Sequence, residues 1–170
     1  MANTGQMLLV LGALLLFSIA LPSLNGTVLY NDKTLFSTNA ELTAISLAQK
    51  ILAEAGSKAF DEVCLTTRPQ SASQLTAVAS LGPEAGENYP QFDDVDDFHN
   101  VTLRDSTTLP SILFIINGSV SYVDPANPSQ AVASQTFAKR LRVTVSGPYL
   151  VNPANDQPGQ ISMEQLYSHF

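Results

Sequence analysis

The sequence predicts an α+β protein in which a long N-terminal helix packs on a small antiparallel β-sheet. The first observation is an uncharged apolar stretch near the start of the 170-residue chain. The second is a segment, residues 38–62, in which apolar residues recur every three or four positions, as on one face of a helix. The third is a series of apolar and alternating runs between residues 112 and 167, which is typical of strands. We expect a helix with an apolar first half and an amphipathic second half, followed by the sheet.

These patterns divide the chain into four parts. Residues 1–5 are a candidate short leader, and residues 6–24 are a helix suited to a membrane. Residues 25–62 comprise a linker and the amphipathic helix, and residues 63–170 form a β-rich head.

The apolar stretch runs from Met7 to Leu24 without a charged side chain. About 18 residues make a helix about 27 Å long, close to the hydrocarbon thickness of a bilayer. A cleaved secretory signal and an uncleaved anchor both have such a stretch. Residues Met1–Gly5 carry no Lys or Arg and no clear A-x-A site follows, which disfavours a cleaved signal. The small residues Gly12, Ala13 and Ala20 would allow close approach between helices.

A break and a new helix start are predicted next. Pro22 lacks a backbone donor and would kink a helix, and Asn25-Gly26 has low helix propensity. Thr38 followed by Glu41 is a capping-box pattern, which predicts a helix N-terminus.

The predicted second helix is amphipathic. Its apolar stripe consists of Leu42, Ile45, Ala48, Leu52, Ala55 and Ala59, widened by Leu47 and Ile51. Glu54 and Lys58 have the spacing of an i,i+4 ion pair. The stripe predicts that this helix packs on the sheet.

An acidic stretch follows a loop rich in Gly and Pro. It contains Asp93, Asp94, Asp96 and Asp97. Carboxylates this close repel one another unless they are solvated, hydrogen-bonded or bridged by a cation. Two interpretations remain: a solvated or hydrogen-bonded loop, or calcium ligands at these four aspartates. The spacing lacks the Gly and the distal Glu of an EF-hand, and no other cofactor is expected.

The second half reads as strands and turns. Residues 112–116 are an apolar run, and Asn117-Gly118 predicts a hairpin turn directly after it. A turn cluster at Asp124–Pro128 ends the next alternating run. Residues 147–159 read as a loop and residues 161–167 as a short last strand.

Residues 137–146 (FAKRLRVTVS) alternate again between apolar and polar side chains, most clearly from Leu141 onward. Leu141, Val143 and Val145 should face the helix. The basic residues of this run, Lys139, Arg140 and Arg142, either keep the sheet surface soluble or pair with the acidic stretch.

Composition excludes several function classes. The net charge of −7 argues against nucleic-acid binding, which depends on Lys and Arg. One cysteine cannot form an intrachain disulfide or a CxxC metal site. His99 and His169 are the two histidines, and no GxSxG, HExxH or phosphate-binding glycine motif is present. We therefore expect no enzymatic activity and no catalytic residue.

The order of these segments resembles type IV pilin-like proteins. Residues 44–62 (AISLAQKILAEAGSKAFDE) are similar to the amphipathic half of the long pilin helix. The resemblance is to minor pilins of the mannose-sensitive haemagglutinin type and to pseudopilins of type II secretion. The stretches FDDVDDFHN (residues 92–100), YVDP (residues 122–125) and KRLRVTVSGP (residues 139–148) are similar to the former group.

The resemblance implies a structural subunit that assembles through its apolar helix into a pilus-like or secretion filament. It implies cleavage by a prepilin peptidase between Gly5 and Gln6, and a filament-core helix that includes Gly12, Ala13, Ala20 and Pro22. Prepilins, however, carry a basic leader and a Glu early in the apolar segment, and both are missing here.

The implied location is the bacterial inner membrane, crossed once, with the head outside the cytoplasm. The partners would be further copies of this chain and other pilin-like subunits. The alternative function is a membrane-anchored or secreted β-rich binding module that uses its N-terminal segment only as a tether or signal.

Overall fold

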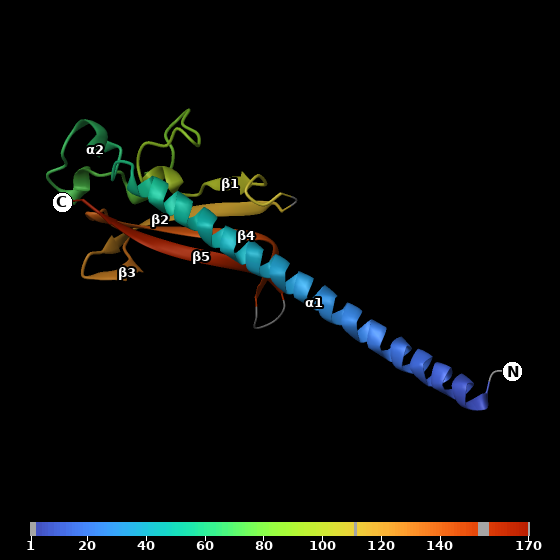
Figure 1. Cartoon of the computed structure of the whole chain (residues 1–170). Coiled ribbons are helices and arrows are strands. Elements are labelled where there is room, and N and C mark those ends of the chain that lie inside the picture. Colours follow the sequence, from blue (N-terminus) through green and yellow to red (C-terminus); the bar gives the residue numbers. More distant parts are fainter. Residues whose placement is uncertain (1–2, 111, 153–156, 170) are drawn as a thin grey trace. The chain divides into compact units, whose positions relative to one another are not determined.

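The computed structural model describes residues 3–110, 112–152 and 157–169, with the backbone alone at residues 23–29, 31, 151, 152 and 157. It shows an N-terminal helix, short helical turns and an antiparallel sheet (Figure 1), which confirms the α+β class. The helices are α1 (Thr4–Gly56) and α2 (Val63–Thr66), and the 3-10 turns are η1 (Ala72–Gln74), η2 (Val78–Ser80) and η3 (Asp96–Phe98). The strands are β1 (Thr102–Asp105), β2 (Phe114–Asp124), β3 (Asn127–Ala131), β4 (Ala138–Asn152) and β5 (Gln157–Ser168). The chain has two compact units, residues 1–39 and 40–170, which are described separately.

Helix α1 contradicts the predicted break. It continues through Pro22 and Asn25-Gly26, so residues 25–37 are helical and Thr38 lies inside the helix rather than at its N-terminus. Ending one helix and starting another would leave about four carbonyls and four N–H groups without helical partners, whereas one proline removes a single donor. The capping pattern at Thr38 is not needed as a helix start, since the preceding turn already supplies acceptors.

The head begins with the last four turns of α1, and one face of this segment is buried. The buried residues are Ala40, Ala44, Leu47, Ala48, Ile51, Leu52 and Ala55. Leu42, which was expected on this face, is 59% exposed, because the buried stripe starts at Ala40 and not at Leu42. Packing on the sheet is confirmed by one shared core with β2 and β4 and by the Tyr167 hydroxyl, which donates to the Leu52 carbonyl at 2.6 Å.

The predicted ion pair between Glu54 and Lys58 does not form. The helix ends at Gly56, so the two residues do not face each other across a helical turn. Lys58 donates to the Phe92 carbonyl at 2.5 Å, and Glu54 accepts from the Tyr89 hydroxyl at 3.0 Å. Both side chains connect the end of α1 to the segment that leads into η3.

The sheet is antiparallel throughout its named strands, with the order β1-β2-β4-β5 and with β3 paired to β2. Leu141, Val143 and Val145 are fully buried, as the alternation predicted. The turn after Asp124 is also confirmed, because β2 and β3 form a hairpin around it. The predicted loop at residues 147–159 is largely strand: β4 continues to Asn152 and β5 starts at Gln157.

The predicted hairpin at Asn117-Gly118 is wrong. Both residues lie inside β2, where they pair with Thr144 and Val143 of β4. Glycine is required at this point for a different reason. A Cβ atom on Gly118 would lie 2.2 Å from the carbonyl oxygen of Phe98, so the backbone at the end of η3 approaches the strand more closely than any side chain allows.

Candidate functional site

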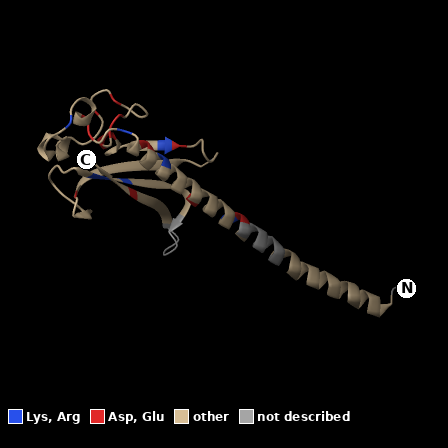
Figure 2. Ribbon diagram, turned by 60° about the vertical axis from the view of Figure 1, so that its left-hand side comes forward, with Lys and Arg blue, Asp and Glu red and all other residues tan. Residues whose placement is uncertain are grey.

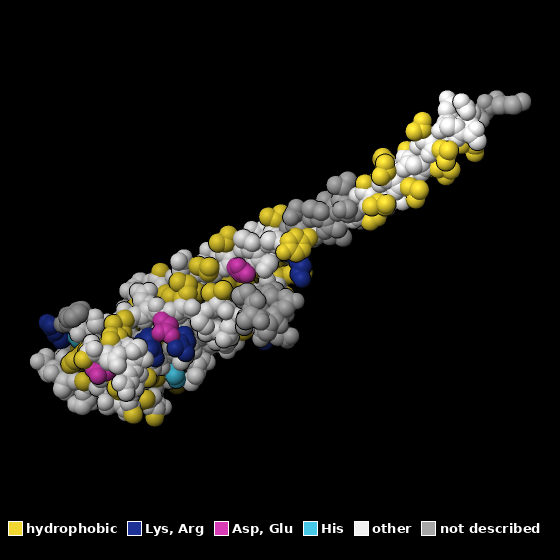
Figure 3. Space-filling view, turned by 90° about the horizontal axis from the view of Figure 1, so that it is seen from below, with side chains coloured by type: hydrophobic (Ala, Val, Ile, Leu, Met, Phe, Trp, Pro, Cys, Tyr) yellow, Lys and Arg dark blue, Asp and Glu magenta, His cyan; other side chains and the backbone are white. Residues whose placement is uncertain are grey.

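The first candidate site is the apolar surface of α1 between Thr4 and Pro22. Its large side chains are exposed all round the helix, since the five consecutive residues Met7–Leu11 are all exposed, and Figure 3 shows apolar side chains along one face; Leu9 is 75% exposed and Leu16 is 72% exposed. Figure 2 shows the same segment without a charged residue. The hydroxyl of Ser18 donates to the Leu15 carbonyl at 3.0 Å, so this polar group has a partner within the helix. Such a surface is suited to lipid or to other apolar helices.

Residues 4–22 have a mean hydropathy of 2.1, and none of this segment is buried. The helix is therefore long and apolar enough to cross a membrane. By length and composition alone, it fits a membrane anchor and a signal sequence equally well.

The residues expected to matter for processing and assembly all lie on this helix. Gly5 and Gln6 belong to its first turn, and the Gln6 N–H donates to the Asn3 carbonyl at 2.8 Å. Gly12, Ala13, Ala20 and Pro22 follow along the helix. A Cβ atom added to Gly12 would meet nothing within 4 Å. The space beside this glycine is thus open to another molecule.

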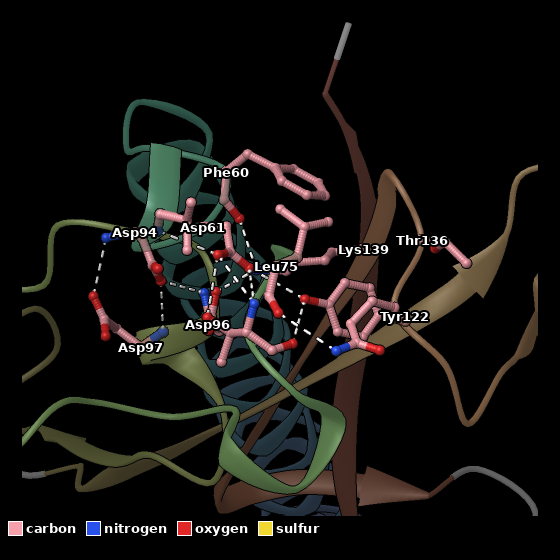
Figure 4. Close-up of polar contacts among 12 residues, drawn as sticks. Phe60, Asp61, Leu75, Asp94, Asp96, Asp97, Tyr122, Thr136 and Lys139 are labelled. Atoms are coloured by element: carbon pink, nitrogen blue, oxygen red, sulfur yellow. Dashed lines mark hydrogen bonds and ion pairs between the residues drawn. The ribbon is translucent and has the colours of Figure 1, made fainter. Parts of the chain in front are cut away.

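The second candidate site is a polar cluster inside the head, centred on Lys139 (Figure 4). The Lys139 side chain is completely buried. Its ammonium donates to Asp61 Oδ2 at 2.8 Å, to the Phe60 carbonyl at 2.8 Å and to Asp96. The ring of Phe60 lies 4.8 Å from the ammonium nitrogen and that of Tyr122 lies 5.3 Å from it. One lysine thus joins β4 to the segment after α1 and to η3.

Asp61 is the most fully hydrogen-bonded carboxylate of this cluster. It accepts from the Thr76 N–H at 3.0 Å, the Tyr122 hydroxyl at 3.1 Å and the Val63 N–H at 3.3 Å, besides Lys139. Burial alone would raise the pKa of Asp61, but the hydrogen bond and charge of Lys139 and the backbone donors together lower it. Asp61 is therefore held as an anion.

The acidic stretch folds into a hydrogen-bonded turn. Asp94 Oδ1 accepts from the N–H groups of Asp96 and Asp97 at 2.7 and 3.2 Å. Asp97 Oδ2 accepts from the N–H groups of Asp93 and Asp94 at 2.9 and 3.0 Å. The hydrogen-bonded interpretation of this stretch is confirmed, although three of its four carboxylates are buried rather than solvated.

The four aspartates are not brought together as one set of calcium ligands. Asp96 is paired with Lys139, and Asp94 accepts from the backbone N–H of Asp96 in the same turn. Burial, followed by the charge of Asp96, raises the pKa of Asp94 to about 9, so this carboxyl is neutral at pH 7. In the described part of the chain, the group of carboxylates close enough to share a cation consists of Glu84, Glu87 and Asp97. Of the predicted ligands, only Asp97 belongs to it.

The basic residues of β4 divide between two environments. Arg140 and Arg142 approach Glu164 on β5 at the surface, with nitrogen to oxygen distances of 3.7 and 2.5 Å. Lys139 instead pairs with the acidic stretch, which was one of the two expected outcomes. Alternation predicts this difference, because Lys139 has the same parity as the inward-facing Leu141. The roles of Asp61, Glu84 and Glu87 had no comparable signal in the sequence.

Both histidines take part in local packing. His99 Nδ1 accepts from the Val120 N–H at 3.1 Å. The ring of His169 lies 5.7 Å from that of Phe60 and 5.8 Å from that of Phe137. These contacts join η3 to β2 and the end of β5 to the loops beside it.

Comparison of the chain with protein-family models, curated proteins and solved structures finds no match.

Proposed function

We propose that the protein is a structural subunit of a type IV pilus-like or type II secretion-like filament, with its apolar helix in the filament core. The observation that carries the proposal is α1 itself. Its first part exposes apolar side chains in every direction, and its last four turns pack on an antiparallel sheet. A subunit of this kind holds its helix in the membrane first and then exchanges lipid for neighbouring helices.

The proposed role is mechanical rather than catalytic. The helix would associate with the same helix of other subunits, and the head would form the outer surface. Before assembly, the subunit would span the bacterial inner membrane once, with its head outside the cytoplasm. Prepilin peptidase would remove residues 1–5 and leave Gln6 as the first residue.

The small residues of α1 distinguish this proposal from a simple membrane anchor. Gly12→Leu keeps the helix apolar, and its Cβ atom meets nothing within 4 Å in the described part of the chain. In an anchor the substitution is harmless. In a packed filament core it separates neighbouring helices, so we expect at least a tenfold loss of sheared surface filaments with unchanged membrane levels.

The test compares cells that produce Gly12→Leu, Ala20→Leu and, as a volume-conserving control, Leu16→Ile. The amount of protein in sheared and membrane fractions is measured by immunoblotting. Normal filament yield from both leucine variants would contradict the proposal. A wild-type protein that stays in the membrane without filaments would favour the anchored binding module.

A further inference from the structure

Glu84 and Glu87 lie in a tight loop between η2 and η3. The N–H of Glu87 donates to the carbonyl of Glu84 at 3.0 Å, which closes a turn. Gly82 and Gly86 have φ angles of 130° and 96°, a backbone conformation that favours glycine. This loop brings both glutamates to the Asp97 side chain, so that one oxygen from each of the three carboxylates lies within 4.8 Å of the others.

Asp97 differs from an ordinary surface carboxylate. The residue is completely buried, and its Oδ2 atom accepts two backbone N–H groups. Its Oδ1 atom is also buried but has no hydrogen-bond donor. A buried carboxylate oxygen without a partner is strongly destabilising. Oδ1, like Asp94 Oδ2 and Asp96 Oδ2, can therefore still accept from a cation or a proton donor.

Glu84, Glu87 and Asp97 form a group of three acidic side chains. None of the ion pairs among the described residues involves Glu84, Glu87 or Asp97. Glu62 adds a further acidic side chain close to Glu87 and Asp97. A divalent cation would offset two of the negative charges of this group.

We propose that Glu84, Glu87 and Asp97 bind a calcium ion that fixes the loop of residues 81–88 to η3. All three donors are carboxylate oxygens, which suit hard cations and not the metals that prefer nitrogen or sulfur. Calcium binds oxygen at about 2.3–2.6 Å, so opposite ligands lie roughly 4.6–5.2 Å apart, and the present separations fit inside that shell. Magnesium gives up its water reluctantly, which favours calcium at a site with three protein ligands.

This calcium site differs from the one that the sequence suggested. It takes two ligands from the loop before the acidic stretch and one from the stretch itself. The loop then gains a fixed connection to η3, and through Asp96 to the buried Lys139. The site lies wholly in the head, so its test does not depend on membrane insertion or filament assembly.

In the experiment, calcium chloride is titrated into the full-length protein in detergent, and binding is measured by isothermal titration calorimetry. We expect one calcium ion per chain. Glu84→Gln and Glu87→Gln each remove one carboxylate ligand and should weaken binding by at least about tenfold. Glu62→Gln removes a nearby charge but no ligand, and should change the affinity by less than about threefold. Asp97→Asn is a poorer variant, because Asp97 also holds the turn of η3.

Terbium luminescence gives a second measurement. The chain has no tryptophan, and Tyr89 is two residues from Glu87, so tyrosine excitation reports on this region. Terbium emission should saturate, be displaced by calcium and fall in both glutamine variants. The proposal is overturned by no saturable calcium binding up to about 10 mM, a range that includes weak extracellular sites. Equal binding by wild type, Glu84→Gln and Glu87→Gln would also overturn it.

Discussion

Apolar side chains are usually buried and charged ones exposed. The apolar part of α1 departs from the first rule, and the cluster around Lys139 departs from the second. Residues 4–22 expose large apolar groups, whereas the head buries a lysine and the aspartates that pair with it. The buried lysine is satisfied within the chain, by two carboxylates and a carbonyl. The exposed apolar groups have no such internal solution. Each costs about 1.5–3 kcal/mol relative to burial, so this surface is suited to a membrane or to other apolar helices.

The comparison predicts that the two regions respond differently to mutation. Substitutions around Lys139 should change the free energy of unfolding of the head. Substitutions on the apolar helix should change only where the protein goes and what it assembles with.

The largest effect is expected for Lys139→Met. The variant leaves Asp61 and Asp96 buried without their counter-charge, which should lower the free energy of unfolding by about 3–5 kcal/mol. The measurement is urea unfolding followed by the near-ultraviolet circular dichroism of the tyrosines. The matched control is Arg142→Met, whose partner Glu164 is at the surface and whose ion pair contributes about 0–1 kcal/mol. Similar losses in both variants would mean that burial does not distinguish these pairs.

A smaller effect is expected for Gly118→Ala. The added Cβ would collide with the Phe98 carbonyl and push η3 away from β2, at a cost of about 1–3 kcal/mol. Gly56→Ala is the control, because its Cβ would lie at an ordinary 3.4 Å from the Tyr167 ring. If thermal unfolding shows Gly118→Ala to be as stable as wild type, the backbones of Phe98 and Gly118 do not approach each other this closely.

The effect expected for Asp94→Asn is of a different kind, because it depends on pH. The folded pKa of Asp94 is about 9 and lies above the unfolded value. The stability contributed by its proton is therefore complete below about pH 4 and is lost as the pH rises toward 9. The amide stays neutral and its oxygen still accepts the N–H groups of Asp96 and Asp97.

The free energy of unfolding of Asp94→Asn should therefore fall less steeply than that of wild type between pH 5 and pH 9. Asp105→Asn is the control. Backbone N–H donors, chiefly that of Thr108, lower the pKa of Asp105, so it titrates below this range. Parallel pH profiles for wild type and Asp94→Asn would show that Asp94 is already ionised at neutral pH.

The spacing of apolar residues predicted those parts of the fold that depend on one face of a single helix or strand. The apolar stretch, the helix packed on the sheet and the inward side of β4 follow from spacing alone. The errors at Thr38 and at Asn117-Gly118 share a cause. Both are local signals for an end or a turn, and in both cases a longer element overrides them. The glycine of the second signal serves the approach of Phe98, a contact between segments that no local rule describes.

The polar sites were harder to predict because their members are far apart in the sequence. Asp61 and Lys139 are separated by 78 positions, and the acidic stretch alone gave no reason to prefer Asp97 over its neighbours. Asp94, Asp96 and Asp97 each bury a carboxylate oxygen without a donor, and Asp97 is the one of these three that also lies beside Glu84 and Glu87. That property exists only once the chain is folded.

In the proposed filament, the apolar helix stays on the mature protein and joins the subunits. Intact mass and N-terminal sequencing of the native protein, from membrane fractions and from sheared surface material, test it most directly. We expect a chain that begins at Gln6, keeps residues 7–24 and is present in the sheared filaments. A mature chain that begins after Leu24 would contradict it, because the helix would then be a cleaved secretory signal.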